Sequence, residues 1–558
     1  MDRPAAKSPK RKDDRVILQF DYDCFYASVF ENQNPALKSV PLGVRQKGIL
    51  ATCNYVARAR GVSKLTQISV AKKACPELVI VDGEDLTPFR DVSKKLYRLL
   101  KSHSWNGKVE RLGLDEVFMD VTDIVDYNIF FLNRASLSTS FFCLSRNDPE
   151  QGFPCDLTHF AGCVEGASSD TVDFDSPLCL RLLLGSHLAN YLRMKLENDR
   201  GFTSTCGIAT NKLLSKLAGN RNKPRNQTTL LSLRDEDVTT FVDGHSLRQV
   251  PWIGYKTSKL LHSKLLPDLP PQDPMTPECK LTAGDVRTHP EISAASLEVL
   301  LGGPGAEKGI GQRVWSLLHG VDDTEVKPAN DIPTQISIED TYRGLDGIGC
   351  ITDELRKIAR SLLRRMRVDL VIDDESPHKE AVRRWVARPK TLRLSVNAPP
   401  TDKEEHHSFS RVSRSAPLPN FVFSLKEDVG ELADRLVDEA VLPLLRKFQG
   451  GRELTWEVSL LNICVANMVL AGSDDASGSG RDISVMFKTQ DDVLRPFRVA
   501  PPPEKDKGAE SGEVEADDDG WDPEWDGFID GEPCSQCGYR IPYFALAAHL
   551  RYHELGDE

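Results

Sequence analysis

Two adjacent carboxylates stand where charge should be costly. Asp115 and Glu116 lie between two short apolar runs, within the segment ERLGLDEVFMD at residues 110–120. Neighbouring side chains of a strand point to opposite faces, so these two can reach one point only where the backbone turns, as in a tight hairpin at residues 113–116. If Asp21, which ends another apolar run, ends the adjacent strand, three carboxylates converge.

Such a cluster needs a cation, because unpaired carboxylates repel one another and some would have raised pKa values. Hard oxygen ligands select Mg²⁺ or Mn²⁺, and a cluster serving two ions roughly 3.5–4 Å apart suits in-line phosphoryl transfer. For either motif alone, a cap at Asp21 or Asp23 and a turn at Asp115 are favoured. Groups suited to a triphosphate favour phosphoryl transfer, and they are Tyr55, Arg58 and Lys223.

The size of the chain predicts several domains, because 558 residues exceed what one core usually holds. The net charge of −12 is confined to the end of the chain. Residues 501–558 contain 16 acidic and 4 basic residues, so the other 500 residues contain 67 of each. A neutral body of this kind can carry the basic face that binding to backbone phosphates requires.

The chain has no run of eighteen apolar residues and no apolar core near its N-terminus, which predicts an intracellular protein with no membrane partner. Most of the 13 cysteines are therefore expected to be reduced. Lys7, Lys10, Arg11 and Lys12 form a basic arm. It is interpreted equally well as a nuclear-import signal or as a solvated cluster.

Further elements follow from apolar spacing. The stretch after Tyr127 has little periodicity and is interpreted as a surface insertion. Residues 205–224 indicate a strand, a turn and a helix. Residues 354–366 place apolar side chains on one helical face and basic ones on the other, within a predicted small α+β domain.

Six segments together make the chain resemble the Y-family translesion DNA polymerases. They are residues 21–29, 41–62, 83–93, 109–123, 207–224 and 250–261, and the similarity continues more weakly to about residue 466. The resemblance implies a multidomain α/β and α+β fold shaped as a right hand, with a small ββα zinc finger. The implied parts are a disordered basic arm at 1–13, a palm with fingers at 14–235 (fingers about 32–82), a helical thumb at 236–325, a little finger at 331–499, an acidic disordered linker at 500–530 and a zinc finger at 531–558.

The resemblance also implies roles for single residues. Asp21, Asp115 and Glu116 are expected to be the catalytic metal ligands, assisted by the Tyr22 carbonyl. Tyr26 matches the steric gate that excludes a ribose 2′-hydroxyl, although an aromatic residue after a strand is usually part of a core. Tyr55, Arg58 and Lys223 match the triphosphate contacts, which leaves Asp23 a structural role.

The fingers segment indicates a branch of the family. Gln46, Lys47 and Ile49 occupy positions that crowd the templating base in the branch that pairs a syn purine through its Hoogsteen edge. Gly48 replaces a larger residue there, and Ile49 replaces leucine. Either change could relax the constraint, so the branch that reads the Watson–Crick edge is the alternative.

Two regions are expected to contact DNA without reading its sequence. Arg364 and its basic neighbours suit backbone phosphates. Residues 250–261 resemble a helix-hairpin-helix, although Trp252 stands where glycine is usual.

The last segment has the spacing of a zinc site. Cys534 and Cys537 are followed by His549 and His553, which lie one helical turn apart. The resemblance implies a ubiquitin-binding finger, with Ala545, Leu546 and Ala548 as its apolar surface. Arg551 departs from that pattern, so a purely structural role is the alternative.

These patterns predict a DNA-directed DNA polymerase in the nucleus that extends a primer opposite damaged template bases. Its implied partners are primer–template DNA, deoxynucleoside triphosphates, and ubiquitin or a ubiquitylated sliding clamp. Its implied cofactors are two Mg²⁺ or Mn²⁺ ions and one Zn²⁺. The rival hypothesis is an inactive scaffold that binds DNA and ubiquitin.

Overall fold

The computed structural model describes residues 9–166, 173–266, 281–303, 306–329, 332–374, 382–397, 411–448, 457–470, 531–533 and 540–542. The chain divides into two compact units, Met1–Ala471 and Gly472–Glu558. The first unit mixes helices with several separate sheets, which confirms the predicted multidomain α/β class.

The largest sheet, called the main sheet below, has six strands in the order β5-β6-β1-β10-β11-β9. The strands are β1 (Ile17–Tyr22), β5 (Val109–Leu112), β6 (Glu116–Asp120), β9 (Cys163–Gly166), β10 (Ser204–Ala209) and β11 (Gln227–Leu231). The central strand β1 is antiparallel to both β6 and β10. The predicted hairpin is present, with β5 and β6 joined at residues 113–115.

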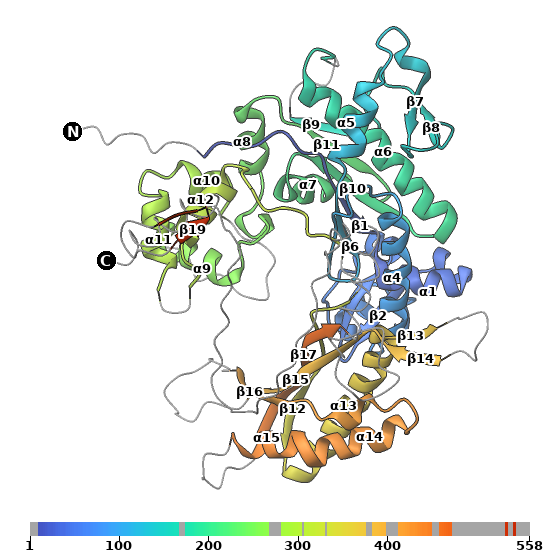
Figure 1. Ribbon diagram of the computed structural model, residues 1–558, viewed down its shortest axis with the longest axis vertical. Coiled ribbons are helices and arrows are strands. Elements are labelled where there is room, and N and C mark those ends of the chain that lie inside the picture. Colours follow the sequence, from blue (N-terminus) through green and yellow to red (C-terminus); the bar gives the residue numbers. More distant parts are fainter. Residues whose placement is uncertain are drawn as a thin grey trace, which may run out of the picture. The chain divides into compact units, whose positions relative to one another are not determined.

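Strict alternation along β1 separates two environments. Leu18, Phe20 and Tyr22 are buried in the core formed with the long helix α6 (Pro177–Arg200). The odd-numbered side chains point to the opposite face, where α7 (Lys212–Gly219) packs against β1, β10 and β11. A Cβ added at Gly219 of α7 would lie 2.2 Å from the Gln19 amide oxygen, so the odd-numbered side chains of β1, Asp21 included, lie on the α7 side of the sheet. Figure 1 shows α7 beside β1 and β10. Two more helices accompany α6, namely α4 (Thr87–Lys101) and α5 (Thr122–Phe130).

The stretch after Tyr127 is only in part a surface insertion. Its strands β7 (Ser140–Cys143) and β8 (Gly152–Cys155) form a separate hairpin. However, β9 pairs in parallel with β11 and completes the main sheet, and Phe142 and Leu157 are buried in the main core. Strands of four residues are too short to show a period, which explains why the sequence pattern missed them.

A three-stranded sheet, called the small sheet, is ordered β3-β2-β4. Its elements are β2 (Leu42–Gln46), β3 (Ile49–Cys53), β4 (Val79–Asp82), α2 (Tyr55–Ala59) and α3 (Ile68–Ala74). Leu50, Ala57 and Leu78 belong to its own buried core. Helix α1 (Phe25–Gln33) follows β1 and packs against β2 and β3.

A helical segment follows the main sheet. It comprises α8 (Asp235–Asp243), α9 (Tyr255–Leu265), α10 (Ala283–Thr288), α11 (Ala294–Leu301) and α12 (Ile310–Leu318). Its side chains share a core with α7, including Leu214, Val242 and Leu318. The connection after α12 then runs against the main sheet, where Val326 is buried beside Ile17 and Phe118.

A four-stranded sheet, called the C-terminal sheet, is ordered β12-β17-β15-β16. Its elements are β12 (Gln335–Asp346), β15 (Ala387–Asn397), β16 (Arg411–Pro417), β17 (Glu457–Leu470), α13 (Ile348–Leu370), α14 (Val429–Leu436) and α15 (Leu442–Arg446). A two-stranded sheet pairs β13 (Val371–Asp374) with β14 (Val382–Trp385). The apolar face predicted for residues 354–366 is confirmed, because Leu355, Ile358, Ala359, Leu362, Leu363 and Met366 are all buried.

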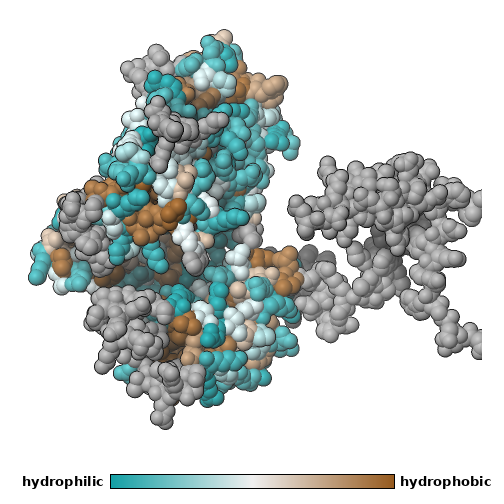
Figure 2. All heavy atoms as spheres, turned by 90° about the vertical axis from the view of Figure 1, so that its left-hand side faces the viewer, coloured by the Kyte–Doolittle hydropathy of each residue, from teal (hydrophilic) through white to brown (hydrophobic). Residues whose placement is uncertain are grey.

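In the second unit the described residues form one short antiparallel pair, β18 (Gly531–Pro533) and β19 (Arg540–Pro542). The predicted zinc ligands Cys534, Cys537, His549 and His553 lie outside the described residues. Among the helices that the structure describes, none has the length and apolar character needed to cross a membrane. The face drawn in Figure 2 is largely hydrophilic, with hydrophobic residues gathered in separate patches.

Candidate active site

The register of the main sheet brings two of the predicted ligands together. Asp21 of β1 is the direct cross-strand partner of Glu116 at the start of β6. Like charges placed opposite each other across a strand pair destabilise a sheet unless something neutralises them. The two positions lie 95 residues apart in the chain (116 minus 21), so pairing of strands, and not local sequence, creates this contact.

Asp115 completes the group from the turn between β5 and β6. Gly113 adopts a φ of 74° there, and the Tyr22 N–H donates a hydrogen bond to the Asp115 carbonyl over 2.9 Å. Burial, followed by the charges of Asp21 and Glu116, raises the pKa of the Asp115 carboxyl to about 6. The pKa of Asp115 thus reports that the three carboxylates share one electrostatic environment.

Two lysines face this group from the α7 side. The Lys223 ammonium lies 2.6 Å from Asp21 Oδ2, and Lys216 of α7 pairs with Glu116. The Gln19 amide also donates to Glu116 Oε2, over 3.4 Å. Sequence reasoning identified Lys223 but missed Lys216. The signal was available, because Lys212 and Lys216 lie four residues apart and therefore share one face of a short helix.

Close contact between α7 and the sheet positions these lysines. A Cβ added at Gly207 of β10 would lie 1.9 Å from the Ser215 carbonyl oxygen and 2.3 Å from the Gly219 nitrogen. Only glycine permits this approach of helix to strand. The other end of α7 is fixed by Asn211, whose side chain accepts a hydrogen bond from the Leu214 N–H over 2.9 Å.

The predicted nucleotide-binding side chains border the carboxylates. The Tyr26 ring stacks on Phe89 with 4.2 Å between ring centroids, and its pKa is raised by burial and then by the charge of Asp115. On α2, the Arg58 guanidinium lies over the Tyr55 ring at 4.5 Å. Burial raises the pKa of Tyr55 first, and the charges of Asp23 and Asp21 are among its other causes. These side chains therefore lie within electrostatic range of the carboxylate group.

Asp23 is bound within the protein. The Thr205 hydroxyl donates to its Oδ1 over 3.1 Å and the Arg225 N–H donates to its Oδ2 over 2.9 Å. The Asp23 side chain is buried, and both of its carboxylate oxygens accept hydrogen bonds from the protein in place of water. This geometry agrees with a structural role.

The predicted template-base residues lie on the hairpin between β2 and β3. The Gln46 amide donates to the Gly83 carbonyl over 2.9 Å, and the Lys47 ammonium pairs with Asp340 and Thr341 of β12. Ile49 is 38% exposed and lines, with Lys47 and Gly48, a cavity of about 870 Å³. A Cβ added at Gly48 meets nothing within 4 Å.

The donor set at the carboxylates fits a hard divalent cation in its chemistry, since carboxylate oxygens are the preferred ligands of Mg²⁺ and Mn²⁺. The pKa of Asp115 shows the repulsion that a bound cation would relieve. Within the described part of the chain, however, no three acidic, histidine or cysteine side chains are arranged to hold a metal ion. Instead, two of the three carboxylates form ion pairs with lysines, Glu116 with Lys216 and Asp21 with Lys223.

Two regions were expected to contact DNA, namely the segment that contains Trp252 and the basic face of α13, and they differ in how exposed their side chains are. Trp252 is 44% exposed and adopts a φ of 72°, the left-handed conformation that glycine takes easily. On α13, several basic side chains are engaged within the protein. Arg356 lies 3.2 Å from Asp438, and the Arg367 guanidinium donates to the Ser424 carbonyl over 2.9 Å. Arg364 is exposed.

Comparison with known proteins adds independent information. Residues 20–220 match the impB/mucB/samB family. DNA polymerase iota of Homo sapiens is 32% identical over 459 residues, which cover 81% of this chain and 52% of that protein. DNA polymerase iota of Drosophila melanogaster is 33% identical over 360 residues, 64% of this chain and 42% of the relative.

DNA polymerase eta of Arabidopsis thaliana is 25% identical over 519 residues, 89% of this chain and 68% of that protein. The eta-like alternative is therefore not favoured over iota. The chain spans about half the length of the human and mouse relatives that it matches. The comparisons agree with one another: residues 20–220 match the impB/mucB/samB family, and over a longer stretch the chain is similar to DNA polymerase iota.

Proposed function

We propose that the chain is a template-directed DNA polymerase that performs translesion synthesis. The observation that carries this proposal is the alignment of Asp21 with Glu116 across two central strands, with Asp115 in the adjoining turn. A carboxyl whose pKa is raised to about 6 by burial and like charge is typical of functional sites and supports the proposal. Names of the relatives support the same reaction.

In this proposal Asp21, Asp115 and Glu116, with the Tyr22 carbonyl, would hold two Mg²⁺ or Mn²⁺ ions. When bound, such ions supply activation of the primer 3′-hydroxyl and charge neutralisation on the leaving pyrophosphate. The chain itself holds the three carboxylates at fixed positions on β1, β6 and the turn. Rigid strands of this kind keep reacting groups aligned.

Lys223 and Lys216 are proposed to have different roles when metal ions and a nucleotide are bound. Lys223 pairs with Asp21 in the protein alone, and it would be available to bind the triphosphate if Asp21 held a cation. Arg58 and Tyr55 then contact the same phosphates from α2. Lys216 remains beside Glu116 and limits the negative charge of the site.

Tyr26 is proposed as the gate that selects deoxynucleotides. Phe89 supports its ring from behind, so the ring cannot yield when a ribose 2′-hydroxyl approaches. Gln46, Lys47 and Ile49 are proposed to shape the space around the templating base, as in an iota-like enzyme that uses Hoogsteen pairing. The cavity beside Ile49, widened by Gly48, is the place where a purine would turn.

The remaining regions are proposed to hold DNA. The main sheet with its helices and the small sheet would form palm and fingers, the helical segment the thumb, and the C-terminal sheet the little finger. Helix α13 covers one face of that sheet (Figure 1), and it carries the exposed Arg364. The opposite face presents Arg393 and Arg411, of which Arg411 pairs with Glu339, so both faces are candidates for phosphate contact.

The C-terminal segment is proposed to be a zinc finger that binds ubiquitin or a ubiquitylated sliding clamp in the nucleus. Four ligands at zinc spacing support the metal, namely Cys534, Cys537, His549 and His553. The described pair β18 and β19 flanks the two cysteines in the sequence, which is the arrangement expected of a ββα finger.

Primer extension tests the proposal. The purified protein is given primer–template DNA, deoxynucleotides and Mg²⁺, beside the variants Asp115→Ala and Asp123→Ala. Loss of extension in Asp115→Ala by a factor of about 10³ or more, with unchanged DNA binding, is expected. Asp123, a carboxylate at the start of α5 and away from the cluster, serves as the matched control. Extension by Asp115→Ala at the rate of the control would refute the metal assignment.

A further inference from the structure

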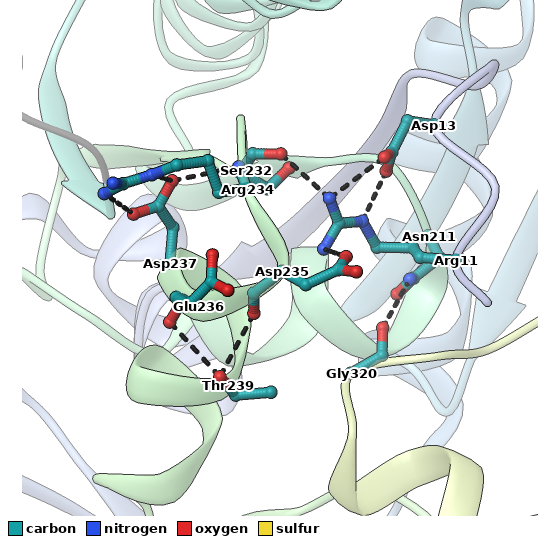
Figure 3. Close-up of polar contacts among 10 residues, drawn as sticks. All are labelled: Arg11, Asp13, Asn211, Ser232, Arg234, Asp235, Glu236, Asp237, Thr239 and Gly320. Atoms are coloured by element: carbon teal, nitrogen blue, oxygen red, sulfur yellow. Dashed lines mark hydrogen bonds and ion pairs between the residues drawn. The ribbon is translucent and has the colours of Figure 1, made fainter. Parts of the chain in front are cut away.

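One basic residue of the N-terminal arm is built into the fold. The Arg11 side chain is only 5% exposed (Figure 3). Its guanidinium binds both carboxylate oxygens of Asp13, donates to the Ser232 carbonyl over 3.0 Å and lies 3.2 Å from Asp235 Oδ1. A guanidinium with three partners in a fixed fork is far better ordered than a solvated surface arginine.

The partners of Arg11 mark one particular place in the chain. Ser232 follows β11, the last strand of the main sheet along the chain, and Asp235 is the first residue of α8. Arg11 therefore holds the point where the chain leaves the main sheet for the helical segment. Arg234 and Asp237 close the first turn of α8 from the other side, as Figure 3 shows.

The same N-terminal stretch also holds the point where the chain returns. The Arg15 guanidinium donates to the carbonyls of Asp322 and Thr324, over 3.0 and 3.1 Å. Lys12 lies 3.5 Å from Asp323. From α7, the Asn211 amide donates to the Gly320 carbonyl over 3.0 Å, beside the Arg11 contacts in Figure 3.

We propose that residues 11–15 form a clasp that positions the helical segment on the main sheet, with Arg11 as its principal positioning residue. Entry and exit of the helical segment are both tied to one short stretch that immediately precedes β1, the strand that carries Asp21. The clasp thus connects the placement of a DNA-binding thumb to the active-site strand. This inference rests on the proposed polymerase function for its consequence, but not for its geometry.

The clasp also separates Arg11 from the other basic residues of the arm. Lys10 is exposed, whereas Arg11 is buried among acidic and carbonyl partners. Removing either side chain subtracts one positive charge from the same place. Only Arg11 removal releases the entry of the helical segment, so Lys10→Ala is a matched control for the loss of charge.

The test uses the full chain and two measurements. Hydrogen–deuterium exchange reports on residues 232–243 and 320–324 in wild type, Arg11→Ala, Arg11→Lys and Lys10→Ala. Anisotropy of a labelled primer–template measures DNA affinity of the same proteins at one salt concentration. Asp235→Asn, at a side chain that is 84% exposed, removes one partner with little risk to folding.

Arg11→Ala is expected to accelerate exchange at residues 232–243 by about tenfold, the factor for one lost charge-assisted hydrogen bond, while residues 320–324, which Arg15 holds, serve as the internal reference. It should weaken DNA binding about fivefold beyond Lys10→Ala, because the helical segment must then be ordered on binding. Arg11→Lys, which keeps the charge but loses the fork, should fall between wild type and Arg11→Ala. Incorporation at saturating DNA should stay unchanged.

Unchanged exchange in Arg11→Ala would overturn the clasp, as would equal DNA affinities of Arg11→Ala and Lys10→Ala. If Arg11→Ala does not fold, the same two measurements on Asp235→Asn test the clasp. Exchange should then be faster and DNA binding weaker than in wild type, by smaller factors than those given for Arg11→Ala. A wild-type protein that incorporates no nucleotide would remove the polymerase proposal but leave the exchange and DNA-binding results to judge the clasp.

Discussion

Asp115 bears the electrostatic cost of the carboxylate group. Burial and the charges of Asp21 and Glu116 all disfavour its ionised form and raise its pKa to about 6. Functional sites often retain such unfavourable groups because ligand binding relieves them. Removing the charge should therefore stabilise the protein while it destroys the proposed activity.

The first prediction concerns Asp115→Asn in the presence of a chelator. The folded protein binds the Asp115 proton more tightly than the unfolded chain, so this carboxyl favours folding below about pH 4, and that contribution is lost as the pH rises to about 6. The variant should gain about 1–3 kcal/mol over wild type as the pH rises through this window. Urea unfolding at pH 4.5, 6 and 7.5 measures the difference. A difference that does not change with pH would contradict the account.

Lys216 provides the second prediction at this scale. Without its ammonium, Glu116 faces Asp21 and Asp115 uncompensated, so Lys216→Met should lose about 1–3 kcal/mol in metal-free buffer. A divalent cation should then raise the melting temperature more in the variant than in wild type. Thermal scans with and without Mg²⁺ test this, with Lys195→Met, which breaks a surface pair with Asp199, as control. Equal Mg²⁺ shifts in all three proteins would rule out the cation at this position.

At the scale of elements, the contact of α7 with the sheet decides where both lysines stand. The third prediction is that Gly207→Ala costs about 2–4 kcal/mol and reduces nucleotide incorporation, because the added Cβ would meet backbone atoms of α7. Gly349→Ala is the control, since a Cβ there meets nothing within 4 Å on α13 and should be neutral or slightly stabilising. Equal stability of the two variants would show that α7 can move at no cost.

The hairpin between β2 and β3 supports the fourth prediction. Gly48 has open space around it and lines the same cavity as Ile49. Gly48→Leu should fold normally, narrow the cavity, and increase the ratio of insertion opposite template A to insertion opposite template T by about tenfold. Steady-state insertion kinetics measure this ratio, and Gly349→Ala, where an added Cβ meets nothing within 4 Å, controls for glycine loss. An unchanged ratio would exclude this hairpin from template selection.

The sequence predicted the elements that local patterns encode. The turn at residues 113–115 followed from Gly113 and the flanking strands, and the buried face of α13 followed from its helical spacing. It failed where distant segments meet. The pairing of Lys216 with Glu116 joins residues 100 positions apart, and Arg11 meets Ser232 across 221 positions. No local period records such contacts.

At the scale of the whole molecule, the sequence patterns also failed to predict short strands. Strand β9 contributes only Cys163–Gly166 to the main sheet, yet it completes the edge beside β11. On α13 the sequence did not predict that some of the arginines pair within the protein, while Arg364 is exposed. Carboxylates such as Asp434 and Asp438 lie against the basic face of α13 from residues far along the chain. Charge patterns along one helix do not reveal what packs beside it.

Insertion of single nucleotides on four primer–templates, one for each templating base, tests the central claim most directly. Wild type and Asp115→Ala are compared with Mg²⁺ and with Mn²⁺. The account predicts efficient insertion opposite template A, poor accuracy opposite template T, and no insertion by Asp115→Ala. Comparable insertion opposite all four bases would contradict the iota-like pairing, and absence of insertion by wild type would contradict the polymerase itself.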